Sequence, residues 1–168
     1  MSKSAPKIKT TVVGSYPVPS WLVAAPSEQA LIDATRTVIG TQETAGLDVV
    51  CDGELYRFDI NHPETNGMIE YFTRPMVGIR NDSSFDEVIA YRSQEGMGFR
   101  TKPPGVVDGA IDHGTLDLPY AAMRAHRLAT KPLKFTLTGP HMLAKTLINK
   151  HYKDLPAMTM AIAEVLAE

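Results

Sequence analysis

The run that ends in Val13, Gly14 and Ser15 is the first place in the chain where a ligand could bind. Gly14 has no side chain, so a ligand could approach the backbone closely there. Ser15 adds a hydroxyl and an N–H group, which can both contact a polar ligand. Taken alone, the turn favours the interpretation of Gly14 as an ordinary turn glycine over that of a ligand contact.

Glu54 follows the apolar run Leu47 to Cys51 after Asp52 and Gly53, and it is the most informative acidic residue in the chain. A carboxylate directly after a buried strand must be solvated, paired or aimed at a ligand. Arg57 is the local ion-pair alternative. Arg100, with Thr101 beside it, is either a surface charge or a contact for a ligand that carries a carboxylate.

Histidine and cysteine spacing does not indicate a metal site. Cys51 is the single cysteine, and no histidine pair has the i, i+4 or His-x-Cys spacing of a zinc site. His141 stands at a strand-to-helix turn and is the one histidine to watch. Phosphate-loop, dinucleotide-binding and serine-elbow motifs are absent as well, and we predict no metal ligands in this chain.

The elements that must position these residues begin with a strand over Lys9 to Ser15. Tyr16 to Pro26 holds three prolines and is predicted to be a loop. Ser27 can cap a helix that runs to about Ala45, and Leu47 to Cys51 has the length and β-branching of a buried parallel strand. Strand, helix and strand in this order form a βαβ unit, which favours an α/β sheet or barrel.

The rest of the chain continues the alternation of strands and helices. The predicted elements are a short helix around Gly67 to Phe72, a strand over Ser84 to Tyr91, a strand that begins at Gly105, a helix over Leu118 to Ala129, a strand over Lys134 to Thr138, a helix over His141 to Lys150, and a last helix that opens at Asp154 or Leu155. These make about four strand-plus-helix units.

Four such units are about half of a (β/α)₈ barrel, which takes roughly 250 residues. We therefore expect an α/β protein of the (β/α)₈ TIM-barrel type that is incomplete, with residues 1–168 forming the N-terminal half of a single barrel domain. Open sheet edges would favour a complementary half-barrel or self-association.

Composition narrows the class of partner. The chain has 168 residues and a net charge of −2, without the basic footprint of a nucleic-acid binder. Its apolar runs are too short to span a membrane, and Met1 to Lys9 lacks the apolar core of a signal peptide. A single cysteine fits a reducing cytoplasm. We expect a cytoplasmic protein that binds neither nucleic acid nor membrane.

Several strings together resemble the catalytic domain of the cobalamin-independent methionine synthase family. They are TTVVGSYP, ETAGLDVVCDGELYRFD, MIEYF, FRTKPPGVVDGAI and KPLKFTLTGPHML, which occur in the family's order between residue 9 and about residue 148. The resemblance implies a (β/α)₈ barrel that transfers a methyl group from a donor such as methyl-folate to the thiol of homocysteine, with zinc activating the thiol.

The resemblance also implies roles for individual residues. Val13, Gly14 and Ser15 would hold the amino-acid part of homocysteine or a similar thiol amino acid, and Glu54 would bind its ammonium group. Arg100 and Thr101 would lie on the folate side. Thr146 stands where the family has a folate-stacking tryptophan. This difference weakens the assignment of polyglutamyl-folate as the methyl donor and favours other donors.

The family's zinc ligands have no counterpart in this sequence, so we expect no cofactor and no turnover for this chain alone. One alternative is a barrel of the same superfamily that acts on another thiol or methyl donor, of the coenzyme M or corrinoid type. Another is a truncated, non-catalytic subunit for binding or assembly.

Overall fold

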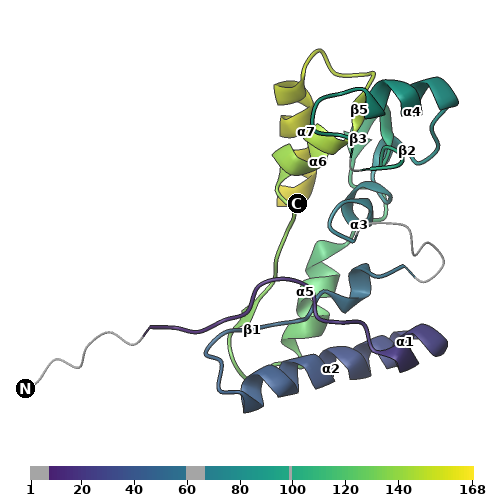
Figure 1. Cartoon of the computed structure of the whole chain (residues 1–168). Helices are drawn as coiled ribbons and strands as arrows, with labels where there is room; N and C mark the ends of the chain where they lie inside the picture. Colours follow the sequence, from purple (N-terminus) through teal and green to yellow (C-terminus); the bar gives the residue numbers. More distant parts are fainter. Residues whose placement is uncertain (1–7, 60–66, 99) are drawn as a thin grey trace, which may run out of the picture. The chain divides into compact units, whose positions relative to one another are not determined.

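The computed structural model describes residues 8–59, 67–98 and 100–168, and the chain forms two compact units (Figure 1). Unit 1 comprises the described part of Met1–Ile60 together with Leu118–Thr136. Unit 2 comprises the described parts of Asn61–Asp117 and Leu137–Glu168. Residues 1–7, and His62 among the five histidines considered for a metal site, lie outside the described residues.

Unit 1 is built around the long helix α2, Glu28–Thr44, which begins where the sequence predicts. The Ser27 hydroxyl accepts a hydrogen bond from the Ala30 N–H (3.0 Å), as an N-cap residue does. The buried face of α2 packs with Leu22 and Leu55 in one apolar cluster. Leu22 belongs to α1, Ser20–Ala24, so the prediction of a loop over Tyr16 to Pro26 was wrong in its centre.

Unit 1 contains a short parallel sheet of two strands. Strand β1, Val50–Cys51, pairs in parallel with β4, Leu133–Lys134, and Val50 lies opposite Leu133. Helix α5, Leu118–His126, precedes β4 in the chain, as predicted. Both strands are shorter than predicted: β1 is compared with the run Leu47 to Cys51, and β4 with the run Lys134 to Thr138. Directly after β1 the chain turns into a short 3₁₀ helix, η1, Leu55–Arg57.

The predicted strand over Lys9 to Ser15 is wrong as a regular element, although the segment is tied to the chain around β1. The Thr10 carbonyl accepts hydrogen bonds from the N–H groups of Asp48 and Val49, at 3.1 Å each. At Cys51, where a neighbouring strand would pair, the buried Gln42 amide takes the place of that strand. Its Oε1 accepts from the Cys51 N–H (2.9 Å), and its Nε2 donates to the Cys51 carbonyl (2.8 Å). No continuous ladder forms, because Gln42 occupies the groups that would extend it.

Unit 2 contains a three-stranded sheet in the order β2-β3-β5. Strand β2, Val77–Arg80, is antiparallel to β3, Val106–Asp112, and β3 is parallel to β5, Ile148–Asn149. The sequence predicts β3 from Gly105 onward, and it does not predict β2 or β5. Ile148 lies within the helix predicted over His141 to Lys150, and that helix, α6, covers only Pro140–Thr146.

Helix α4, Phe85–Arg92, occupies the run Ser84 to Tyr91 that was predicted to be a strand, so that prediction was wrong. The reason is a capping box: the Ser84 hydroxyl accepts from the Glu87 N–H, and the Glu87 carboxylate accepts from the Ser84 N–H. These bonds satisfy backbone groups that a helix start leaves open. A strand offers no equivalent, so the local chemistry favours the helix.

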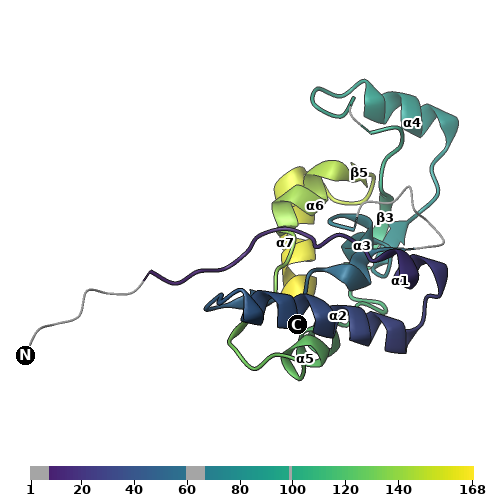
Figure 2. The ribbon, with the colours of Figure 1, turned by 60° about the horizontal axis from the view of Figure 1, so that its bottom comes forward.

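Helices α6 and α7 pack against each other in unit 2, and Figures 1 and 2 both show them side by side. Helix α7, Leu155–Ala167, begins at Asp154, whose carboxylate accepts from the Ala157 N–H (2.8 Å). Its Met158 and Ile162 are fully buried, as the predicted apolar stripe requires. Helix α3, Glu70–Thr73, overlaps the helix predicted around Gly67 to Phe72. Of the described helices, none is long and apolar enough to cross a membrane.

Candidate functional site

The chain leaves β1 through a turn that forces two successive residues into the left-handed region. Gly53 has φ 75°, and Glu54 has φ 58° and ψ 22°. Among the described residues Glu54 is the only non-glycine with a positive φ. The left-handed conformation costs a residue with a side chain about 1–2 kcal/mol. The Asp52 carboxylate compensates, since its Oδ1 accepts a hydrogen bond from the Glu54 N–H at 3.0 Å.

The turn has room for glycine alone at its centre. A Cβ on Gly53 would lie 2.8 Å from a methyl carbon of Val38 and 3.0 Å from the Cβ of Tyr16. The Tyr16 N–H also donates to the Gly53 carbonyl, at 2.9 Å. The turn is therefore held between helix α2 and the segment that carries Ser15.

The Glu54 carboxylate is the centre of a polar cluster at this turn. The Ser15 hydroxyl donates to Oε2 (2.8 Å), and the Thr136 hydroxyl donates to Oε1 (2.6 Å). Arg57 places its Nη1 3.4 Å from Oε2. The Glu54 side chain is only 10% exposed, so these groups replace most of its water. The structure thus places the Ser15 hydroxyl and the Glu54 carboxylate, both singled out in the sequence, in direct contact.

Arg57 is held in place by other contacts besides Glu54. Its Nη2 donates to the Thr136 carbonyl at 2.5 Å, and its guanidinium lies over the Tyr56 ring, 5.5 Å from the centroid. Tyr56 in turn stacks on Phe135 with the ring centroids 5.8 Å apart. The local ion pair that the sequence offers as an alternative is therefore present. It contacts one side of the carboxylate and leaves each oxygen with lone-pair capacity.

The two carboxyl groups of the turn differ in their pKa. Burial acts to raise the pKa of Glu54, but the hydroxyls of Thr136 and Ser15 and the charges of Arg57 and Lys134 outweigh it, and the pKa is lowered. Burial raises the pKa of Asp52, against the Glu54 N–H, Arg57 and the Tyr56 hydroxyl. Glu54 is therefore the group held as an anion, while Asp52 is pushed toward its neutral form.

The segment before Ser15 is open. Gly14 has φ 96°, and no atom lies within 4 Å of the position that a Cβ would take. Val13 is 90% exposed, and the Lys134 ammonium donates to the neighbouring Val12 carbonyl at 2.5 Å. Glycine is needed at position 14 by its backbone angle, and the space beside it suits the close approach of a ligand.

Thr136 is the site residue that the sequence analysis missed. It lies two residues after Lys134 in the run predicted as a strand, so the two share a face of an extended chain. That alternation was the available signal. Asp52 stands in the string ETAGLDVVCDGELYRFD, and the sequence analysis predicts no role for it.

Arg100 and Thr101 belong to unit 2, whereas Glu54 belongs to unit 1, so their place on the folate side stays a prediction. The Arg100 guanidinium forms an ion pair with the buried carboxylate of Glu70 in α3. Thr101 is exposed. The charge of Arg100 is therefore already paired with a carboxylate of its own unit.

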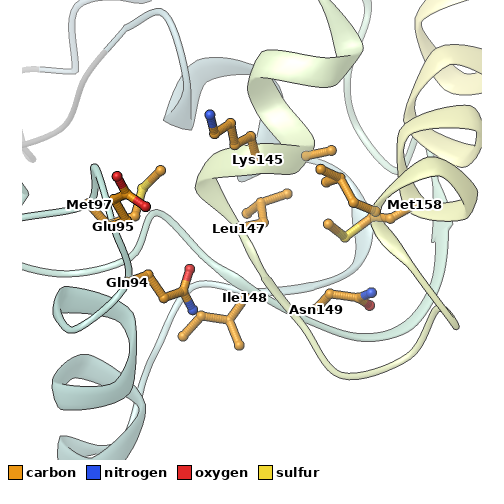
Figure 3. A pocket seen from close by; sticks show the side chains of 10 residues that line it. Gln94, Glu95, Met97, Lys145, Leu147, Ile148, Asn149 and Met158 are labelled. Carbon is orange, nitrogen blue, oxygen red and sulfur yellow. The ribbon is translucent and has the colours of Figure 1, made fainter.

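Unit 2 also contains a hollow of about 350 Å³ between the loop after α4 and the region of α6, β5 and α7 (Figure 3). Lys145 and Glu95 bring opposite charges to its lining. The Asn149 amide serves its own turn, since Nδ2 donates to the Tyr152 carbonyl and Oδ1 accepts the Tyr152 N–H. The polar cluster around Glu54 is the better candidate site.

The chain has parallel strand pairs joined through helices and a polar cluster at the end of β1. These features place it in the (β/α)₈-barrel class, as part of one barrel. A solved B12-independent methionine synthase from a Shewanella strain, in complex with selenomethionine, matches with a TM-score of 0.65 and 21% identity, over 94% of this chain and 45% of that one. The family model described as the catalytic domain of cobalamin-independent synthase matches residues 8–168, and the chain belongs to this family.

Curated relatives agree with the family assignment. A methionine synthase of Sulfurisphaera tokodaii is 29% identical over 96% of this chain and 46% of its own length. A methionine synthase of Pyrococcus furiosus is 28% identical over the same shares of the two chains. This chain therefore spans about half the length of the relatives it matches.

The residues present do not fit the zinc site that the family implies. The single cysteine, Cys51, is buried at the end of β1, with 5% exposure. Within the described residues one group of potential metal ligands occurs, formed by Asp112, His113 and Glu168, and all three are exposed. A solvated histidine with two carboxylates is not the thiolate-containing set of the family. No step of the chemistry is therefore assigned to zinc held by this chain.

Proposed function

We propose that this chain supplies the amino-acid-recognition part of a methyltransferase that methylates the thiol of homocysteine. Glu54 accepts the ammonium group of the amino acid, and the Val13 to Ser15 segment contacts the rest of its amino-acid part. The observation that carries the proposal is that Ser15 and Thr136, from two distant segments, both donate hydroxyl hydrogen bonds to Glu54.

The electrostatics of the cluster support this role. A lowered pKa keeps Glu54 ionised at neutral pH, where the amino acid carries its ammonium. The two donors from Ser15 and Thr136 are neutral, so they orient the carboxylate without cancelling its charge. Arg57 forms an ion pair with Oε2 at 3.4 Å and offsets part of that charge, while Oε1 accepts from the neutral Thr136 hydroxyl. A ligand ammonium would form charge-assisted hydrogen bonds, which are stronger than those of the neutral hydroxyls.

Activation of the thiol is assigned to residues that are not in this sequence. The family's zinc would lower the pKa of the homocysteine thiol when bound, and the donors for it are not present here. We propose that the sequence corresponds to the N-terminal half of the barrel, and that a complementary half provides the chemistry. Metal analysis of the purified chain should find no stoichiometric zinc, and about one tightly held zinc per chain would overturn this assignment.

A second candidate keeps the recognition of the amino acid and changes the methyl donor. Arg100 is engaged with Glu70, which disfavours it as a contact for the carboxylates of folate. Thr146 is buried and donates its hydroxyl to the Leu143 carbonyl at 2.9 Å, so it offers no stacking surface. Both observations favour a donor other than polyglutamyl-folate.

Calorimetric titration of the chain tests the proposal with two matched ligands. One is L-methionine, and the other is 4-(methylthio)butanoate, which lacks only the ammonium group. We expect L-methionine to bind at least about tenfold more tightly, and Glu54→Gln to remove most of this preference, because a hydrogen bond between charged groups contributes roughly 1.5–3 kcal/mol.

Glu164→Gln is the control, since Glu164 is an exposed carboxylate of α7 in unit 2. It should leave both affinities unchanged. Equal binding of the two ligands to the unmodified chain, or an undiminished preference in Glu54→Gln, would remove Glu54 from the role of ammonium acceptor.

A further inference from the structure

Asp52 is a buried carboxylate that contacts the backbone of Glu54. It is 2% exposed, and its Oδ1 accepts the Glu54 N–H at 3.0 Å. Its Oδ2 is also buried and receives no hydrogen bond from the part of the chain that the structure describes. Solvent does not reach Asp52, so the group that can meet a ligand at this turn is Glu54.

The direction of the Glu54 side chain depends on the left-handed backbone at that residue. With φ at 58°, the carboxylate reaches the Ser15 hydroxyl with one oxygen and the Thr136 hydroxyl with the other. An ordinary negative φ would turn the Cα–Cβ bond elsewhere, and neither donor would then fix the carboxylate. Residues other than glycine adopt such angles only where their surroundings impose them.

Asp52 supplies that constraint. Its side chain accepts from the N–H two residues ahead, which closes a turn in which Gly53 provides the first positive φ. Loss of the acceptor would leave the Glu54 N–H without its partner and remove the bond that opposes the strain. The sheet and helix α2 would still hold β1, because the Gln42 amide bonds to Cys51 do not involve Asp52.

We propose that Asp52 is a positioning residue for amino-acid recognition, acting through the backbone N–H of Glu54 to aim the Glu54 carboxylate at the ligand ammonium. The role rests on the proposed function of Glu54. It requires an acceptor oxygen at Oδ1 and no negative charge, which agrees with the direction in which burial moves the pKa of Asp52. An asparagine, which keeps the acceptor, should therefore replace it.

The test compares Asp52→Ala with Asp52→Asn, using L-methionine and 4-(methylthio)butanoate as calorimetric probes on the whole chain. We expect Asp52→Ala to weaken L-methionine about tenfold, as loss of one hydrogen bond allows, and the des-amino compound less than about twofold. Asp52→Asn should stay within about threefold of the unmodified chain for both. Equal weakening of both ligands by Asp52→Ala, or no weakening, would overturn the proposal.

A double variant separates action through Glu54 from a general structural effect. In a Glu54→Gln background, Asp52→Ala should cost L-methionine less than about twofold, because the carboxylate that it aims is no longer there. A full additional tenfold loss would show that Asp52 acts by another route. If Asp52→Ala does not fold, Asp52→Ser carries the same comparison, with an intermediate loss expected for L-methionine alone.

Amide hydrogen exchange gives a readout that does not depend on ligand binding. The Glu54 N–H should exchange faster in Asp52→Ala than in Asp52→Asn, while the Cys51 N–H keeps its protection in both. If the unmodified chain does not prefer L-methionine, the proposed function fails, and the exchange rates still report whether Asp52 holds the turn. Unchanged exchange at Glu54 in Asp52→Ala would overturn the positioning role even where binding is intact.

Discussion

Glu54 in unit 1 and Glu87 in unit 2 are both nearly buried carboxylates, and their partners differ in kind. Glu54 receives two neutral hydroxyls, with Arg57 3.4 Å away. Glu87 receives the guanidinium of Arg80 and the ammonium of Lys150 on one oxygen, and the Ser84 N–H on the other at 2.7 Å. These bonds, with that of Arg80 first, lower the pKa of Glu87 to about 2.

The difference lies in the charge around each carboxylate, and it is what the proposed role of Glu54 rests on. Two cations saturate Glu87, and Arg80 extends the network to Asp108 at 2.9 Å, so the cluster joins α4, β2, β3 and the residue after β5. A further cation would gain little there. Glu54 is oriented by two neutral hydroxyls and contacts one cation, Arg57. Burial alone therefore does not distinguish the two carboxylates; the charge of their partners does.

The largest effect on stability is expected from Glu87→Gln. Its replacement leaves Arg80 and Lys150 without their shared anion, so the thermal midpoint should fall by roughly 5 °C or more, measured by circular dichroism or calorimetry. The preference for L-methionine over 4-(methylthio)butanoate should remain. A loss of that preference with little loss of stability would reverse the roles assigned to the two carboxylates.

The pH dependence of stability should follow the same carboxylate. The pKa of Glu87 is lowered from 4.5 to about 2, so the stability it contributes is present above about pH 4.5 and is lost as the pH falls toward 2. The pKa of Glu54 is also lowered and contributes with the same sign, whereas the raised pKa of Asp52 contributes with the opposite sign.

Urea unfolding of the chain and of Glu87→Gln, at neutral pH and in acid, measures this difference. The variant should show the flatter dependence on pH, because it lacks the group that titrates furthest from its usual range. Parallel curves for the two proteins would contradict the assignment of acid sensitivity to Glu87.

A smaller effect is expected from Thr136→Val, which removes one hydroxyl from Glu54 at nearly constant volume. The thermal midpoint should fall by roughly 2–4 °C, as for one hydrogen bond, and the pKa of Glu54 should rise toward its usual value, measured by carboxyl NMR. Thr138→Val is the matched control. The Thr138 hydroxyl is buried without a partner among the described residues, so its loss should not destabilise the chain.

Helix α2 and its cap, β1, α5, β3 and α7 could be predicted from the sequence, because their signals are local. Ser27 and Asp154 cap the helices that follow them, and the apolar spacing defines the buried faces. The helix α4 was missed although its signal was also local. Ser84 and Glu87 have the spacing of a capping box, whereas the alternation over Ser84 to Tyr91 predicts a strand.

The remaining differences depend on contacts between distant parts of the chain. Arg100 pairs with Glu70, 30 residues away, and Thr136 reaches Glu54 across 82 residues. Val77–Arg80 becomes a strand because β3 pairs with it, and its own sequence carries a glycine at position 78 that weakens any local preference. Local patterns located the turn at Glu54, and only the structure identified the side chains that orient its carboxylate.

The amide of Gln42 has one further consequence, which concerns association between chains. A strand edge with free N–H and C=O groups is a template on which another chain can add by β-pairing, and such addition is a common start of aggregation. Gln42 occupies both backbone groups of Cys51 from within its own unit. A strand that adds at this edge of β1 must first displace a buried side chain, so the edge is protected at the residue that leads into the Glu54 turn.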